Sequence, residues 1–376
     1  MALRILLAPD KFKSTLDATS AGAAMAAGVR DLLPDAEVRV HPLADGGEGT
    51  LDCLAASATG TFVSLDAEDA FGSAVTARVF VTGRTAMLAM HETARLPARP
   101  TPAGALRASS RGTGLAIAAA RERWPEQDIV VFVGGSASTD GGAGAAQSWG
   151  WRLSDAGGRE LAPGGGALRS LTSLTAPAEH RPGTVTGACD VDAPLLGSAG
   201  AAAGFAPQKG AGPREVLLLE EGLANLAARI DADLGVDVAG LAGAGAGGGF
   251  GAGLVAFFGA TLTGGFDLVA EATSLDDDLA WADVVLTGEG RVDEGTLRGK
   301  VVARVAERCS AMGRTCGVVA GEIRLAAEHL PPHETLGVAA VAEVVSVCRR
   351  RDAFAEPGPC VRATTGALVW TLTSRG

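Results

Sequence analysis

The hydrophobic and polar positions near the start of the chain alternate between short apolar runs and longer amphipathic stretches. Arg4–Ala8 predicts a short buried strand, and Leu16–Leu33 predicts an alanine-rich helix that ends at Pro34. Val38–His41 predicts a second strand, after which the loop Ala44–Thr50 opens another helix. This strand–helix–strand–helix order is typical of a parallel sheet that is covered by helices.

The middle of the chain has a different pattern, with shorter segments of alternating hydrophobicity. Phe62–Leu65, Val75–Val81 and Ala86–Met90 predict antiparallel strands joined by turns. Further along, Ile129–Val133 and Thr184–Ala188 predict two more short strands. This region is therefore expected to form a mixed α/β unit of its own.

The last part of the chain returns to alternating strands and helices. It is preceded by Arg214–Leu234, which predicts a strongly amphipathic helix because its large aliphatic side chains recur near helical spacing. The elements expected after it are a strand at Val284–Thr287, a helix at Val301–Met312, a strand at Cys316–Ala320, an apolar element within Val338–Val347 and a final helix around 363–372.

The order of these elements predicts an α/β protein with two α/β domains. One is expected to be a doubly wound parallel-sheet domain formed by both chain ends, residues 1–60 and 276–376. The second, residues 61–275, is expected to be a mixed α/β domain inserted into the first. The length of 376 residues agrees with this organisation, because a domain usually has about 100–200 residues.

The composition excludes several classes of protein. With 47% hydrophobic residues and 53 glycines, the sequence is that of a folded globular chain, not of a disordered or fibrous one. The net charge of −11 disfavours binding to nucleic acid or to an anionic membrane surface. The chain has no tyrosine and only 4% aromatic residues, which disfavours the stacking of single-stranded bases.

The cysteines and the apolar stretches bear on where the protein works. The 6 cysteines show no CxxC spacing and are expected to be reduced and mostly buried. The apolar run before Pro9 is too short for a signal peptide. The uncharged stretch 238–266 is long enough to span a bilayer, but its many glycines predict a loop followed by a short helix around Leu254–Ala260. We therefore expect a cytoplasmic protein with no membrane partner.

Glycine-containing turns with charged residues follow several predicted strands. Ligands of open α/β sheets bind at the carboxyl ends of strands, so these turns are the first places to expect a binding site. One such turn is weak evidence, because exposed carboxylates usually face water, but several turns in one predicted domain support each other. Their charged residues are Asp10, Lys11 and Lys13, then Asp45 and Glu48, and then Glu289, Arg291 and Asp293.

A glycine- and serine-rich segment, GGSASTDGGAG (residues 134–144), follows the predicted strand Ile129–Val133. Successive backbone N–H groups in such a loop, followed by a helix N-terminus, form a cradle for an anion such as a phosphate. The segment lacks the GK[ST] of a Walker motif. A second tract, Gly243–Gly248, fits the string GxGxxG with Asp267 near the distance of a ribose contact, although the residues before it make a poor strand. A dinucleotide-binding alternative therefore stays open.

Any metal ion that the chain binds is expected to be a hard ion with oxygen ligands, not a soft ion with sulfur or nitrogen ligands. With 5 histidines and no paired cysteines, a zinc site is disfavoured. Carboxylate oxygens are typical ligands of Mg²⁺, and the chain has 43 aspartates and glutamates. The sequence therefore favours Mg²⁺ as its metal.

Motifs in a characteristic order run along most of the chain, from residue 1 to near residue 375. They are APDKFKSTL (Ala8–Leu16), PLADGGEGT (Pro42–Thr50), GTG (Gly112–Gly114), GGSASTDGGAG (Gly134–Gly144), ACDVDAPLLG (Ala188–Gly197), PQKGA (Pro207–Ala211) and TGEGRVDEGTLRGK (Thr287–Lys300). Each motif alone is weak evidence, whereas the whole series is highly specific. Together they resemble the bacterial glycerate kinases of the type-1 family.

This resemblance implies a function and an architecture. It implies ATP-dependent phosphorylation of glycerate, in most members giving 2-phosphoglycerate, with ATP and Mg²⁺ as cofactors. It also implies two α/β domains with the active site in the cleft between them. The lysines, glycine-rich loops and carboxylates of these motifs fit phosphoryl transfer, because enzymes that catalyse it mainly position phosphates and neutralise their charge.

The residues of these motifs receive roles as hypotheses. Lys13 would neutralise a phosphate or the glycerate carboxylate. Asp45 and Glu48, or else Asp190, would supply the proton acceptor for the substrate hydroxyl and a Mg²⁺ contact. The residues expected to bind substrate or nucleotide are Asp10, Gly46, Gly47, Gly134, Gly135, Ser136, Lys209, Arg291 and Lys300, and those expected to bind Mg²⁺ are Asp190, Glu289 and Asp293.

Some of these assignments have plainer alternatives. Lys209 could be a solvated surface lysine, and Arg291 could belong to a structural ion pair. The sequence also departs from the family pattern, with Ala89 where a glutamate is usual, Thr139 where an asparagine is usual and Gly295 where a glutamine is common. These departures leave another small hydroxy acid open as the substrate.

Two functions outside the kinase class stay open as well. One is a non-catalytic sensor of a nucleotide or organic acid, and the other is a dehydrogenase that uses the tract Gly243–Gly248. Small molecules are the expected partners in every case. A monomer and a homodimer are both compatible with the sequence.

Overall fold

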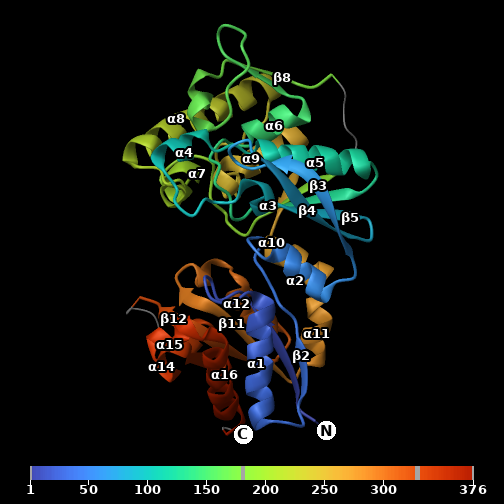
Figure 1. The fold of residues 1–376 in the computed structure, drawn as a ribbon, viewed down its shortest axis with the longest axis vertical. Helices are drawn as coiled ribbons and strands as arrows, with labels where there is room; N and C mark the ends of the chain where they lie inside the picture. Colours follow the sequence, from blue (N-terminus) through green and yellow to red (C-terminus); the bar gives the residue numbers. More distant parts are fainter. Residues whose placement is uncertain (1, 179–182, 327–330, 375–376) are drawn as a thin grey trace. The chain divides into compact units, whose positions relative to one another are not determined.

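The computed structural model describes residues 2–178, 183–326 and 331–374, and the chain divides into two compact units. Unit 1 combines both ends of the chain and consists of Met1–Asp45, Asp52–Ala58 and Phe266–Gly376. Unit 2 consists of Gly46–Leu51 and Thr59–Gly265. Both units are of the α/β type (Figure 1), which confirms the predicted fold class.

Unit 1 is built on a fully parallel sheet of five strands in the order β13-β12-β11-β1-β2. The apolar runs predicted as strands form the centre of this sheet, because side chains on both of its faces must be covered. Its strands are β1 (Arg4–Pro9), β2 (Glu37–Val40), β11 (Val284–Asp293), β12 (Thr315–Arg324) and β13 (Ala340–Glu343).

Helices cover both faces of this sheet, as a doubly wound domain requires. The crossovers β1–α1–β2 and β11–α12–β12 run in opposite directions along the strand order, so right-handed connections place α1 (Ala18–Leu32) and α12 (Val301–Ala311) on opposite faces. α1 packs on α16 (Pro357–Thr373), and the two helices lie side by side in Figure 1. Gly28 permits this close approach, since a Cβ there would lie 2.3 Å from the carbonyl oxygen of Arg362.

The remaining helices associated with unit 1 are shorter. The apolar segment predicted at Val338–Val347 divides into strand β13 and a single helical turn, because the chain must leave the sheet after Glu343. These helices are α2 (Thr50–Ser57), α10 (Gly265–Ala272), α11 (Leu275–Trp281), α13 (Pro332–Thr335), α14 (Val344–Val347) and α15 (Arg350–Ala355), together with the 3-10 turn η3 (Thr296–Arg298).

Unit 2 contains a mixed sheet in the order β10-β9-β6-β5-β4-β3. β3, β4 and β5 are antiparallel, as the alternating pattern predicts, whereas β5, β6, β9 and β10 are parallel. The carboxyl ends of β6 and β9 therefore lie at the same edge of the sheet. The strands are β3 (Thr61–Glu68), β4 (Ala74–Thr82), β5 (Thr85–Ala89), β6 (Asp128–Phe132), β9 (Val185–Ala188) and β10 (Thr261–Thr263), with a separate hairpin of β7 (Arg152–Ser154) and β8 (Ser173–Thr175).

The amphipathic helix predicted in the middle of the chain is confirmed as α8 (Pro213–Leu234). Its face of Leu219, Leu223, Leu226 and Ile230 is fully buried in a core of unit 2. The other helices of unit 2 are α3 (His91–Ala94), α4 (Pro102–Arg107), α5 (Arg111–Arg123), α6 (Ala143–Trp149), α7 (Ala201–Phe205) and α9 (Ala246–Phe258), with the 3-10 turns η1 (Gly165–Ser170) and η2 (Pro207–Lys209).

The glycine tract that left a dinucleotide site open does not have the required setting. The fingerprint needs a strand directly before its first glycine, but in the described part of the chain the element before Gly243 is helix α8. Residues 247–249 have φ of +62°, +73° and +87°, so the tract is an irregular turn at the start of α9. The dehydrogenase alternative is therefore wrong. Among the described residues, no helix is both long and apolar enough to cross a membrane.

Candidate active site

The centre of the unit 1 sheet brings two acidic residues together. The strand order reverses its direction between β1 and β11, and such a switch point is where ligands of open α/β sheets bind. Pro9 is in register with Gly288, and the backbone N–H of Asp10 donates to the Gly288 carbonyl oxygen at 2.8 Å. Asp10 therefore leaves β1 beside Glu289 of β11.

Both of these carboxyl groups are buried, with 6% of each residue exposed. Burial, followed by repulsion from the Asp45 carboxylate, raises the pKa of Asp10 to about 7. Burial also raises the pKa of Glu289 to about 7, and the charge of Asp10 adds to this effect. Groups that titrate near neutral pH beside other carboxylates are suited to bind a cation or to accept a proton.

The segment after Glu289 folds back onto the same carboxyl groups. The Thr296 hydroxyl donates to Glu289 Oε1 at 2.6 Å and accepts from the backbone N–H of Asp293 at 3.1 Å. The Lys300 ammonium lies 3.9 Å from Asp293 Oδ1. The structure thus places Glu289, Asp293 and Lys300 together, and it adds Thr296, which the sequence reasoning missed.

Two assigned cations of unit 1 have exposed side chains. Arg291 was expected in a turn but lies within β11, because that strand continues through Asp293 to pair with β12. Its guanidinium lies 4.0 Å from Glu322, which favours the structural ion pair over a role in binding. The backbone of Lys13 packs against Gly290, where a Cβ would lie 2.9 Å from the Lys13 nitrogen.

The donor set of unit 1 fits Mg²⁺ in its usual protein setting. Mg²⁺ is commonly held by one or two carboxylates, with the other positions taken by phosphate oxygens and water. Asp10 and Glu289 supply two such carboxylates, which are both buried and both lie near a further carboxylate. Within the described residues, no three His, Cys, Asp or Glu side chains are grouped to hold a metal ion by themselves. Of the expected ligands, Glu289 and Asp293 belong to unit 1 and Asp190 belongs to unit 2.

In unit 2, the loop after β6 is packed tightly against a second predicted loop. A Cβ on Gly134 would lie 2.7 Å from Gly47 Cα and 2.9 Å from the Gly46 carbonyl oxygen. Gly135 has φ of +77°, and a Cβ on it would lie 3.2 Å from His91 Cβ. The structure therefore brings together the glycines of both predicted loops, and it leaves no room for side chains between them.

Lys209 is buried beneath this loop, with 5% of the residue exposed, so the surface-lysine alternative is wrong. Its ammonium donates to Ser136 Oγ at 3.2 Å and to the Ser138 carbonyl oxygen at 2.5 Å. Burial lowers the pKa of Lys209 to about 7, and the nearby Asp140 carboxylate opposes this shift. The loop thus has a cation directly beneath it.

Asp140 organises the loop and was missed by the sequence reasoning. Its Oδ2 accepts from the backbone N–H of Ser110 at 2.8 Å and from the Ser110 hydroxyl at 2.9 Å. The buried Ser138 and Thr139 hydroxyls, by contrast, have no hydrogen-bond partner among the described residues. Such buried polar atoms without partners usually mark bound water or ligand.

The other assigned acids of unit 2 lie at the same edge of its sheet. The backbone N–H of Val133 donates to the Ala188 carbonyl oxygen at 3.0 Å, so Asp190 after β9 and Gly134 after β6 follow neighbouring parallel strands. Glu48 is exposed, and its nitrogen would lie 3.9 Å from a Cβ on Gly135.

Comparison with known proteins identifies the family. The sequence profile of the Glycerate kinase family matches residues 5–372. The chain belongs to this family. It is 38% identical to the glycerate 2-kinase of Escherichia coli K12 over 315 residues, covering 81% of this chain and 82% of the relative. It is 38% identical to the glycerate kinase of Halalkalibacterium halodurans and 36% identical to that of Bacillus subtilis, with 85% of both chains covered in each case.

A solved structure agrees with this result. The crystal structure of a protein from Salmonella typhimurium LT2, described as glycerate kinase 2, superimposes with a TM-score of 0.81 at 37% identity, covering 100% of this chain and 99% of that one. Membership of the glycerate kinase family makes the chain an enzyme, a kinase with an alcohol group as acceptor, and not a non-catalytic sensor.

Proposed function

We propose that this glycerate kinase family member transfers the γ-phosphoryl group of ATP to D-glycerate and releases 2-phosphoglycerate, with Mg²⁺ bound during transfer. The observation that supports this most directly is the division of the motif residues into two complementary sets. Unit 1 holds buried carboxyl groups with pKa values near 7, and unit 2 holds a glycine-rich loop over a buried lysine. Phosphoryl transfer requires both a carboxylate site for metal and proton and a cationic cradle for phosphates.

The unit 2 loop is proposed to bind the phosphates of ATP. Gly135 is exposed at this loop, and neither it nor Gly134 carries a side chain that would keep a phosphate from the backbone. Lys209 lies beneath them, and a bound phosphate would favour its charged form over the neutral form. Gly46 and Gly47 would position the loop by their close contact with Gly134.

The unit 1 carboxyl groups are proposed to hold Mg²⁺ and position the acceptor. Asp10 and Glu289 would hold the ion, which when bound supplies positive charge that neutralises the phosphoryl oxygens. Thr296 orients the Glu289 carboxylate through its hydrogen bond. Lys13 would bind the glycerate carboxylate, and Asp45 or Asp190 would accept the proton of the attacking hydroxyl.

Catalysis is proposed to need both units. The loop Ala44–Thr50 is continuous, but Asp45 belongs to unit 1 whereas Gly46 and Glu48 belong to unit 2. We propose that the two units correspond to the expected discontinuous and inserted domains and that the reaction takes place in a cleft between them. We also propose a cytoplasmic enzyme, monomeric or homodimeric, that acts on small molecules without nucleic acid or membrane partners.

The first test is ADP release from Mg·ATP with D-glycerate, followed with and without enolase. Enolase consumes 2-phosphoglycerate but not the 3-isomer, so immediate turnover by enolase is expected. ADP release that enolase does not follow would contradict the 2-product. If ADP is released with another small hydroxy acid but not with D-glycerate, that acid replaces D-glycerate as the proposed substrate.

The proton acceptor is tested by a pair of variants. Asp45→Asn and Asp190→Asn each remove one candidate while preserving shape, and the true acceptor is expected to cost about 10²–10⁴-fold in kcat. Glu307→Gln is a matched control, because Glu307 lies exposed on α12. Wild-type turnover in both aspartate variants would remove these residues from the proton transfer.

A further inference from the structure

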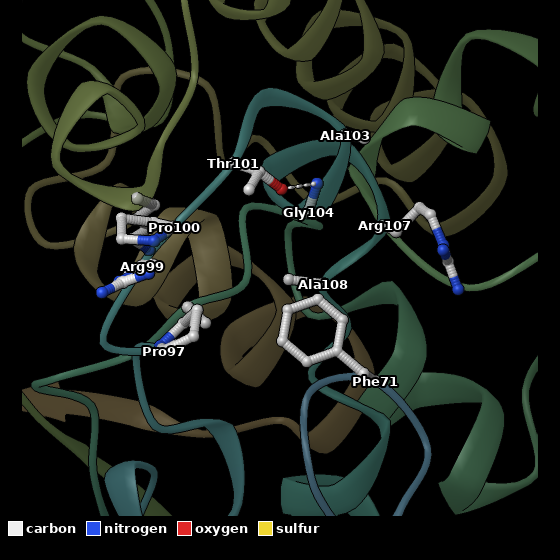
Figure 2. A pocket seen from close by; sticks show the side chains of 11 residues that line it. Phe71, Pro97, Arg99, Pro100, Thr101, Ala103, Gly104, Arg107 and Ala108 are labelled. Carbon is white, nitrogen blue, oxygen red and sulfur yellow. Dashed lines mark hydrogen bonds between the residues drawn. The ribbon is translucent and has the colours of Figure 1, made fainter.

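A cavity of about 270 Å³ lies in unit 2, next to the glycine-rich loop. Its lining includes the buried Lys209 and Ala137, both of which belong to the motifs around that loop. Figure 2 shows the Phe71 ring facing the cavity from below, with Arg99 on one side and Arg107 on the other. None of the described residues that line the cavity is acidic.

The backbone turn that contains Phe71 keeps this residue exposed. Asp69 Oδ1 accepts hydrogen bonds from the N–H groups of Phe71 at 2.8 Å and Ser73 at 2.9 Å, and Gly72 has φ of +87°. This tight turn fixes the position of Phe71 while 44% of the residue stays exposed. Its ring reaches Gly104, where a Cβ would lie 3.8 Å from ring atoms. A rigidly placed, exposed aromatic ring is suited to stacking against a flat ligand.

The charge around the cavity is positive and only partly compensated. Arg99 and Arg107 are exposed, and among the described residues neither forms an ion pair. Lys209, which also lines the cavity, donates to the Ser138 carbonyl oxygen, and the buried hydroxyls of Ser138 and Thr139 in the same loop lack hydrogen-bond partners in the described structure. An aromatic face, two guanidinium groups and a buried cation together point to a ligand that is flat at one end and anionic at the other.

We propose that this cavity binds the base and ribose of ATP, with the Phe71 ring stacked on the base and the phosphates directed past Lys209 to the glycine-rich loop. This inference rests on the proposed function and adds to it the nucleoside subsite. Glycerate is a three-carbon acid without a flat surface, so it cannot stack on the Phe71 ring. The volume of about 270 Å³ lies near the lower end of small-molecule sites, as expected for one part of a nucleotide.

The test separates the base from the phosphates. Mg·ADP and inorganic tripolyphosphate are titrated calorimetrically into the wild-type chain, Phe71→Ala and the double variant Arg99→Gln/Arg107→Gln. Loss of one stacking face is expected to weaken ADP binding about tenfold and to leave tripolyphosphate binding unchanged. The arginine variant is expected to weaken both ligands about fivefold or more. KM for glycerate is expected to stay within twofold in both variants.

Matched controls come from the same unit. Phe62→Ala removes another surface phenylalanine, 42% exposed against 44% for Phe71, and Arg159→Gln removes an arginine whose side chain is 84% exposed. Both controls should bind ADP like the wild type. Melting temperatures of all variants show whether a loss of binding comes from unfolding.

The outcomes distinguish this inference from the proposed function. Wild-type ADP binding in Phe71→Ala, or a rise in KM for glycerate instead of ATP, overturns the nucleoside subsite while the kinase function stands. If Phe71→Ala binds ADP more weakly but the wild-type chain phosphorylates no hydroxy acid, the subsite is supported and the proposed function is overturned. A wild-type chain that does not bind ADP overturns both.

Discussion

At the scale of single residues, the two buried carboxyl groups of unit 1 couple protonation to folding. Their pKa values of about 7 lie above the ordinary values of 3.8 for Asp10 and 4.5 for Glu289. Between about pH 4 and pH 7 the folded chain therefore holds more protons than the unfolded chain. The stability that these groups contribute is present at acid pH and is lost as the pH rises through 7.

We predict that the free energy of unfolding of the ligand-free chain falls between pH 5 and pH 7. Each group contributes at most about 1.4 kcal/mol per pH unit, and Glu289→Gln should reduce the fall. Urea unfolding at several pH values measures it, with the exposed Glu307→Gln as control. An equal fall in Glu289→Gln and in the wild type would contradict the burial of this charge.

Lys209 has the opposite pH dependence. Burial lowers its pKa from 10.5 to about 7, so between these pH values the unfolded chain holds more protons and the stability contributed by Lys209 rises with pH. We predict that Lys209→Met flattens this rise and also raises KM for ATP at least tenfold. Lys13→Met, at an exposed position, is the control for stability. If the free energy of unfolding of Lys209→Met rises from pH 7 to pH 10 as steeply as that of the wild type, the prediction is wrong.

At the scale of elements, the contact between two loops of unit 2 depends on the absence of side chains. We predict that Gly134→Ala lowers kcat/KM at least a hundredfold, because its Cβ would meet Gly47 Cα at 2.7 Å and displace the loops from each other. Gly240→Ala is the matched control, since nothing lies within 4 Å of a Cβ there. Steady-state kinetics measure the effect, and equal kinetics in the two variants would show that the loop tolerates displacement.

The sequence predicted most strands of both units, because their apolar runs end at glycine-containing turns, a signal that is local. It did not predict the short strands β7, β8 and β10. Asp10 and Glu289 were candidate site residues at the sequence level as well, since each follows the apolar part of a strand. Residues that act through distant partners left no local signal. The extension of β11 through Asp293 depends on pairing with β12, and the Thr296 hydroxyl becomes relevant only when the segment folds back onto Glu289.

The burial of a residue was equally hard to predict where tertiary packing decides it. Lys209 follows Pro207 in a short polar segment that has the composition of a surface loop, yet its side chain is buried against Ser136 and Ser138 of the glycine-rich loop. Phe71 presents the reverse case, because an aromatic residue is normally expected in a core. Only the hydrogen bonds of the Asp69–Ser73 turn show why it stays exposed.

At the scale of the whole molecule, the proposed reaction depends on residues of both units, and the first of the four points where the chain passes between them lies between Asp45 and Gly46. We predict that inserting two glycines at this junction leaves each unit folded and leaves ADP affinity within about threefold. The same insertion should lower kcat at least a hundredfold, since misplacement of reacting groups by about 1 Å can cost that much. Insertion after Gly158, an exposed turn of unit 2 with no atom within 4 Å of a Cβ, is the control. Calorimetry and turnover assays on the same preparations separate binding from catalysis, and full turnover after insertion at Asp45 would contradict the need for a fixed Asp45–Gly46 junction.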